Sequence, residues 1–137
     1  RLIAKFAGEQ SLDLSAGDAP SADGDAAAWF AGPCTIFECD WFDASPTLLG
    51  GRFDVAFDSA ALSVVDPSRR ALYAEVLHGL MAPTGRILLV AAEFDEESVD
   101  PGMLSMGPHS IGIGEVGELF WGYSVEILEE EDVSELG

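Results

Sequence analysis

Two short apolar runs, separated by a helical stretch, dominate the pattern of hydrophobic and polar positions. They cover residues 53–58 and residues 86–92. Neither run alternates cleanly between polar and apolar residues, so we expect two strands that are buried on both faces, as in a parallel sheet. A strand, a helix and a parallel strand form a βαβ unit, and ligands of such sheets bind beyond the carboxyl ends of the strands. Asp58, which ends the first run, is therefore the first candidate for chemistry.

The segment between the two runs predicts a helix. Asp66 is a good N-cap, and Pro67 suits the first helical position, where its missing N–H costs nothing. Gly85 is expected to supply the positive φ that often follows a helix end. One apolar stripe has helical spacing: Leu72, Val76, Leu77, Leu80 and Met81.

The segments before this unit have weaker patterns. Residues 1–10 place apolar residues at helical spacing and predict an amphipathic helix. Residues 11–32 are rich in Ala, Gly, Ser, Asp and Pro, which favours a loop that is mobile over residues 15–25. Residues 34–39 predict a strand. Its cysteines, Cys34 and Cys39, would point to opposite faces and could not form a disulfide.

The segments after the unit predict a loop, a helix and a strand. Residues 93–114 are rich in Gly, Pro, Met and Ser, and so long a loop in a compact domain is usually a lid or a binding loop. A short helix over residues 114–121 and a strand over residues 123–128 follow. The acidic run at residues 129–132 is expected to be solvated surface, and no metal site is predicted.

The net charge of −19 limits the kinds of partner that the chain is expected to bind. The chain of 137 residues is expected to be one domain, and it carries 25 acidic against six basic residues. Such a field repels phosphates, so neither nucleic acid nor a membrane is expected as a partner. Neither a signal peptide nor an apolar run of about 18 residues is apparent, which predicts a cytoplasmic protein.

Five stretches, in order, resemble a known family: CTIFECDWFD, GRFDVAFDSAAL, PSRRALY, PTGRILLV, and GPHSI with the later EVGELF. The chain is similar to the thiopurine S-methyltransferases, which are class I methyltransferases dependent on S-adenosylmethionine. The resemblance extends from Arg1 to about Val133, and its most specific part is Phe53–Tyr73. It implies S-adenosylmethionine as cofactor and a small-molecule thiol or halide as acceptor.

The resemblance also implies site residues. Asp40 and Trp41 would lie at the adenine of the cofactor, and Asp58 would face the methyl-transfer pocket. Ser59 stands where the family usually has an arginine that lies near both the cofactor and the substrate. Ser59 is therefore a candidate for the cofactor side and for the substrate side. His109 falls in the loop that lines the substrate side. Structural alternatives are open: Trp41 as core, Asp40 as a turn residue, Asp58 as a cap and His109 as an ordinary loop residue.

The implied fold is α/β, a partial Rossmann-like class I methyltransferase domain. Its sheet would be mostly parallel with flanking helices, and the family's first two strands and its last strand would be missing. The glycine-rich turn and the acid that hold the methionine and ribose parts of the cofactor are absent from this sequence. We therefore expect the chain alone to be inactive, and the full-length parent to be monomeric.

Two classes of function remain. Methyl transfer to a soft nucleophile needs proximity, orientation and desolvation more than an acid–base pair, so no catalytic side chain is predicted. The other class is a non-catalytic acidic α/β module that binds a protein partner. Binding of S-adenosylmethionine would distinguish the two.

Overall fold

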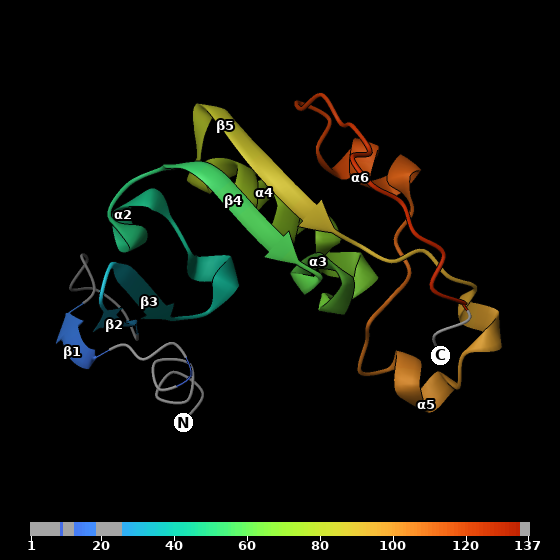
Figure 1. Cartoon of the computed structure of the whole chain (residues 1–137), viewed down its shortest axis with the longest axis horizontal. Helices are drawn as coiled ribbons and strands as arrows, with labels where there is room; N and C mark the ends of the chain where they lie inside the picture. Colours follow the sequence, from blue (N-terminus) through green and yellow to red (C-terminus); the bar gives the residue numbers. More distant parts are fainter. Residues whose placement is uncertain (1–8, 10–12, 19–25, 135–137) are drawn as a thin grey trace.

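The computed structural model describes residues 9, 13–18 and 26–134, and these residues form two small sheets and several short helices (Figure 1). One sheet is antiparallel in the order β1–β2–β3, with the strands Leu14–Asp18, Ala27–Ala31 and Cys34–Glu38. The other is a parallel pair, β4 (Phe53–Ser59) and β5 (Met81–Val90). The architecture is therefore mixed α/β with a parallel strand pair, as the sequence predicts. The expectation of a mostly parallel sheet is wrong for the described residues, because β3 pairs with β2 in a separate antiparallel sheet.

The predicted loop over residues 11–32 is wrong where the structure describes it. Strands β1 and β2 lie in this segment, and their register runs from Leu14 opposite Ala31 to Asp18 opposite Ala27. The many small residues give no alternating pattern in the sequence. Backbone pairing of β1 with β2 and of β2 with β3 orders this segment instead. The predicted strand over residues 34–39 is confirmed as β3. The helix predicted over residues 1–10 falls outside the described residues, apart from Glu9.

The crossover between β4 and β5 is helical, in three pieces. They are α3 (Ala61–Val64), the 3-10 turn η2 (Pro67–Arg69) and α4 (Arg70–Leu80). Asp66 caps the start as predicted, since its carboxylate accepts a hydrogen bond of 2.9 Å from Ser68 N. The predicted stripe is partly wrong, because Leu72 is 45% exposed. The buried side chains of α4 are Arg70, Tyr73, Ala74, Leu77 and Leu80.

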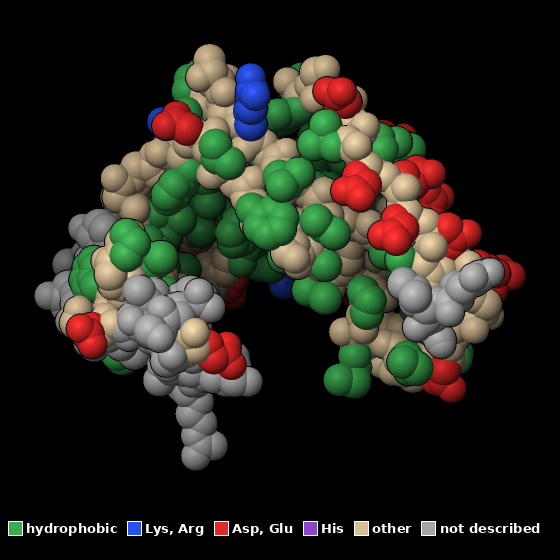
Figure 2. All heavy atoms as spheres, viewed as in Figure 1, with side chains coloured by type: hydrophobic (Ala, Val, Ile, Leu, Met, Phe, Trp, Pro, Cys, Tyr) green, Lys and Arg blue, Asp and Glu red, His purple; other side chains and the backbone are tan. Residues whose placement is uncertain are grey.

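Helix α4 covers only one face of the parallel pair. The core contains Leu62, Tyr73, Leu77 and Phe120, and the inward residues of β4 and β5 pack on it. The opposite face is exposed, which corrects the expectation of strands buried on both faces; Figure 2 shows hydrophobic side chains gathered over this central part. The outward residues include Val55, Phe57, Leu88 and Val90.

Gly85 has a different role from the predicted one. Helix α4 ends at Leu80, and Met81 is already extended, so no left-handed residue is needed there. Gly85 is not among the glycines with positive φ in the described chain. It is required by close approach instead, because an added Cβ would lie 2.7 Å from Met81 Cε, 3.0 Å from the Ala82 carbonyl oxygen and 3.1 Å from the Phe53 carbonyl oxygen.

We expect Gly85→Ala to lower the free energy of unfolding by about 1–3 kcal/mol, the usual cost of overpacking against backbone that cannot move freely. Gly79→Ala is the matched control. An added Cβ at Gly79 meets nothing within 4 Å, so the helix should gain about 0.5–1 kcal/mol. Urea unfolding of both variants tests this, and equal effects at the two sites would contradict it.

The chain after β5 is made of short helices. They are η3 (Glu96–Ser98), α5 (Pro101–Leu104) and α6 (Ile113–Leu119). The predicted helix over residues 114–121 is thus confirmed as α6, whereas the segment 93–114 is not without structure. The strand predicted over residues 123–128 is absent from the described chain. Among the residues that the structure describes, no helix has the length and apolar character needed to cross a membrane.

Candidate functional site at the end of strand β4

Asp58 lies at the carboxyl end of β4 and is almost completely buried, at 5% exposure. Its Oδ1 accepts hydrogen bonds from Ala61 N at 2.7 Å and Leu62 N at 3.4 Å, so it caps the start of α3. Its Oδ2 accepts a hydrogen bond of 2.7 Å from the Tyr73 hydroxyl. Both carboxylate oxygens are therefore engaged within the protein.

The turn after β4 is strained at Ala60. This residue has φ 65°, in the left-handed region that a side chain with a Cβ rarely adopts. Its N–H donates to the Val90 carbonyl at 3.1 Å, which anchors the turn to the end of β5. Such strain persists where surrounding contacts enforce it, and it is common at functional sites.

A cavity of about 540 Å³ runs beside β4, between this strand, the helices α3 and α4 and the 3-10 turn η1 (Trp41–Asp43). Its wall is mostly apolar and includes Phe42, Phe57 and Val64. Among the predicted site residues, Trp41, Asp58 and Ser59 line this cavity. Pockets that bind small molecules have this character, with an apolar wall and a few polar groups.

Trp41 and Asp40 differ in their surroundings. The Trp41 ring stacks on Tyr73, with ring centroids 4.8 Å apart. Its Nε1 is buried and has no hydrogen-bond partner among the described residues. Asp40 is exposed and caps η1, since Oδ1 accepts a hydrogen bond of 2.9 Å from Phe42 N. It does not line the cavity.

His109 also lies outside the cavity wall. Its backbone N–H donates a hydrogen bond of 2.7 Å to the Ser63 carbonyl in α3. Its Nδ1 lies 3.9 Å from Glu96 Oε1. His109 is thus adjacent to α3, a helix that borders the cavity. The side chain of His109 does not join Trp41, Asp58 and Ser59 in the cavity wall.

Tyr73 and Arg70 are important residues that the sequence reasoning missed. Tyr73 connects Trp41 with Asp58, because its ring stacks on one and its hydroxyl donates to the other. Burial, and then the hydrogen bond and charge of Asp58, raise the pKa of Tyr73 far above its usual range, so the hydroxyl stays a donor at neutral pH. The sequence did contain a signal for these residues, because Arg70, Tyr73, Ala74 and Leu77 have the spacing of one helix face. The charge of Arg70 made this face look exposed rather than buried.

Comparisons with known proteins identify the family of the chain. The family described as thiopurine S-methyltransferase (TPMT) matches residues 3–136, so the chain belongs to the thiopurine S-methyltransferase family. The resemblance inferred from the sequence is thereby confirmed.

Individual relatives have the same description. A thiopurine S-methyltransferase of Vibrio campbellii is 31% identical over 101 residues, which are 74% of this chain and 43% of that protein. The one of Bos taurus is 33% identical over 106 residues, 77% of this chain and 41% of that protein. The one of Methylococcus capsulatus is 30% identical over 106 residues, 77% of this chain and 45% of that protein. The chain thus spans less than half the length of these curated relatives.

Proposed function

We propose that the protein containing this chain transfers a methyl group from S-adenosylmethionine to a small soft nucleophile, a thiol or a halide. The observation that carries the proposal is a family match over residues 3–136, together with an apolar cavity at the end of β4. The finer fold that we infer is a Rossmann-like class I methyltransferase domain, to which the β4–α4–β5 unit contributes a parallel strand pair.

The residues at the cavity fit an adenine-containing cofactor. One face of the Trp41 ring is covered by Tyr73, and the other can stack on a purine. The buried Trp41 Nε1 without a partner is a donor for which a ligand can supply an acceptor. Asp40 does not line the cavity but precedes Trp41 in the chain; one of its oxygens caps η1, and the other can accept from an exocyclic amine. When bound, the cofactor supplies an electrophilic methyl group on a sulfonium.

The side chains around the cavity do not supply an acid–base pair. Both oxygens of Asp58 are engaged, by the start of α3 and by Tyr73, so its side chain holds the wall of the cavity in place. Burial, and then the carboxylates of Asp40 and Asp43, raise the pKa of the Cys39 thiol, which disfavours a thiolate nucleophile there. The residues therefore contribute binding, orientation and exclusion of water.

Calorimetric titration of S-adenosylmethionine into the complete gene product tests this function. We expect saturable binding that S-adenosylhomocysteine prevents by competition, followed by methylation of a small thiol or halide. A complete gene product that binds neither compound would refute the proposal and would leave the acidic protein-binding module as the alternative.

We further expect Ser59 to set the acceptor. A hydroxyl cannot provide the charged planar fork of the arginine that the family has at this position, so bulky thiopurines should react poorly and small thiols or halide better. Ser59→Arg should shift the ratio of kcat/KM values toward the thiopurine, and Ser59→Lys, with charge but no fork, should shift it less. Equal turnover of thiopurine and small acceptors by the unmodified protein would count against this role.

A further inference from the structure

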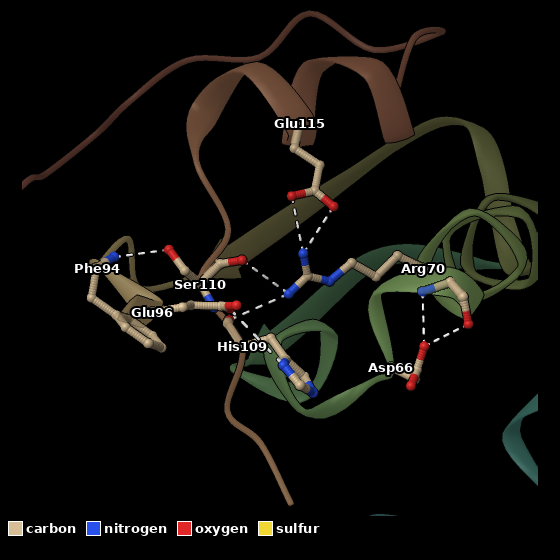
Figure 3. A network of polar contacts seen from close by, with 8 residues as sticks. Asp66, Arg70, Phe94, Glu96, His109, Ser110 and Glu115 are labelled. Atoms are coloured by element: carbon tan, nitrogen blue, oxygen red, sulfur yellow. Dashed lines mark hydrogen bonds and ion pairs between the residues drawn. The ribbon is translucent and has the colours of Figure 1, made fainter. Parts of the chain in front are cut away.

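Arg70 is a buried cation that binds two different parts of the chain. It is the first residue of α4 and is 3% exposed. Its Nη1 donates to Glu115 in α6, at 2.8 Å to Oε1 and 3.0 Å to Oε2. Its Nη2 donates to the carbonyl oxygens of His109 at 3.3 Å and Ser110 at 3.1 Å (Figure 3). A buried guanidinium is tolerated only with partners of this kind.

The carbonyls that Arg70 binds belong to residues 107–111, which we call the crossing segment. The middle of this segment is fixed to α3, because His109 N donates to the Ser63 carbonyl at 2.7 Å. Its last residue is fixed just beyond β5, because Ile111 N donates to the Ala92 carbonyl at 3.0 Å. The crossing segment therefore passes over the carboxyl ends of β4 and β5, where ligands of such sheets bind.

The crossing segment is also held by residues that follow β5. Glu96 Oε1 accepts a hydrogen bond of 2.6 Å from Ser110 N. Ser110 Oγ accepts one of 2.8 Å from Phe94 N. Arg70 and Glu96 thus bind successive polar groups of the same backbone, the carbonyls and an amide (Figure 3). Arg70 is the link that joins this backbone to the helix carrying Tyr73.

We propose that Arg70 is a positioning residue for the acceptor side of the site: its guanidinium fixes the crossing segment against α3, and α3 forms part of the cavity wall through Ala61 and Val64. This inference rests on the proposed function. Lysine cannot replace arginine here, because its compact ammonium does not reach a carboxylate and two carbonyls with separate, fixed donors. The role is one of geometry and does not involve contact with the reacting atoms.

The test compares Arg70→Lys with Arg52→Lys in the complete gene product, since Arg52 is exposed and lies outside this network. Hydrogen exchange followed by NMR should become roughly ten- to a hundredfold faster at the amides of His109 and Ile111 in Arg70→Lys, with little change in β4 and β5. The KM for the acceptor should rise at least fivefold, while the affinity for S-adenosylmethionine stays within a factor of two. Glu115→Gln, which keeps the acceptor oxygen but loses the charge, should give smaller changes of both kinds.

Each result has a definite meaning. Exchange that is unchanged at His109 and Ile111, or that is faster throughout the chain, would overturn the proposal. Faster local exchange with an unchanged KM would overturn it as well, because the segment would then have no part in acceptor binding. A protein without methyl transfer to any acceptor would refute the proposed function, whereas the exchange measurement would still report whether Arg70 orders the segment.

Discussion

Asp58→Ala is expected to lower the free energy of unfolding by about 2–4 kcal/mol. The substitution removes the cap of α3, a loss of about 1 kcal/mol in comparable helices. It also leaves the buried Tyr73 hydroxyl without its acceptor, and an unsatisfied buried donor costs about 1–3 kcal/mol. Urea unfolding followed by circular dichroism measures the sum. The loss should exceed that of any single surface substitution.

Tyr73→Phe provides the control for this prediction. The substitution keeps the ring that stacks on Trp41 and removes only the hydroxyl, so we expect a smaller loss of about 1 kcal/mol. In the Tyr73→Phe background, Asp58→Ala should lower the free energy of unfolding by less than it does alone, because the Tyr73 hydroxyl is then absent and cannot be left without an acceptor. Strictly additive losses would show that the hydrogen bond between Asp58 and Tyr73 contributes nothing.

Trp41→Ala is expected to weaken binding of S-adenosylmethionine by about 1–3 kcal/mol in the complete gene product, a loss typical of base stacking on an aromatic ring. This corresponds to roughly a fivefold to a hundredfold rise in Kd. The physical reason is that the substitution removes an aromatic ring that lines the cavity and its buried Nε1, which has no hydrogen-bond partner among the described residues. Isothermal titration calorimetry is the direct measurement.

Trp121→Ala is the matched control, since this indole is 87% exposed and does not line the cavity. Its removal should leave cofactor affinity unchanged. Trp41→Phe should retain most of the affinity, because a phenyl ring can still stack. An unchanged Kd in Trp41→Ala would remove this residue from the cofactor site and favour its alternative role as an ordinary core residue.

The parts of the fold that the sequence predicted well are those with strong local signals. The cap at Asp66 and the helix α6 depend on neighbouring residues, and both are present. Strands β1 and β2 could not be predicted, because their small residues give no alternating pattern and are ordered by backbone pairing, β1 with β2 and β2 with β3. The exposed face of β4 and β5 was missed for a similar reason, since composition does not reveal whether a second layer covers an apolar strand.

The candidate site was predicted less completely than the fold. The sequence indicated Trp41, Asp58 and Ser59, and the structure brings these three to one cavity. The sequence could not indicate that Tyr73 contacts both Trp41 and Asp58. A hydrogen bond and a ring contact between residues far apart in the chain cannot be recognised from the spacing of residues. The cofactor and substrate roles of all five predicted residues stay predictions, and Asp40 and His109 do not line the cavity.

The parallel pairing of β4 with β5 has a consequence for folding kinetics. Val55 lies opposite Arg86, and the whole helical crossover must close before any hydrogen bond of this ladder can form. Non-local pairing of this kind is slow, whereas the contacts within α4 are local and form early. We therefore expect α4 to be structured in the folding transition state, so that the stabilising variant Gly79→Ala accelerates refolding in stopped-flow experiments and leaves the unfolding rate almost unchanged.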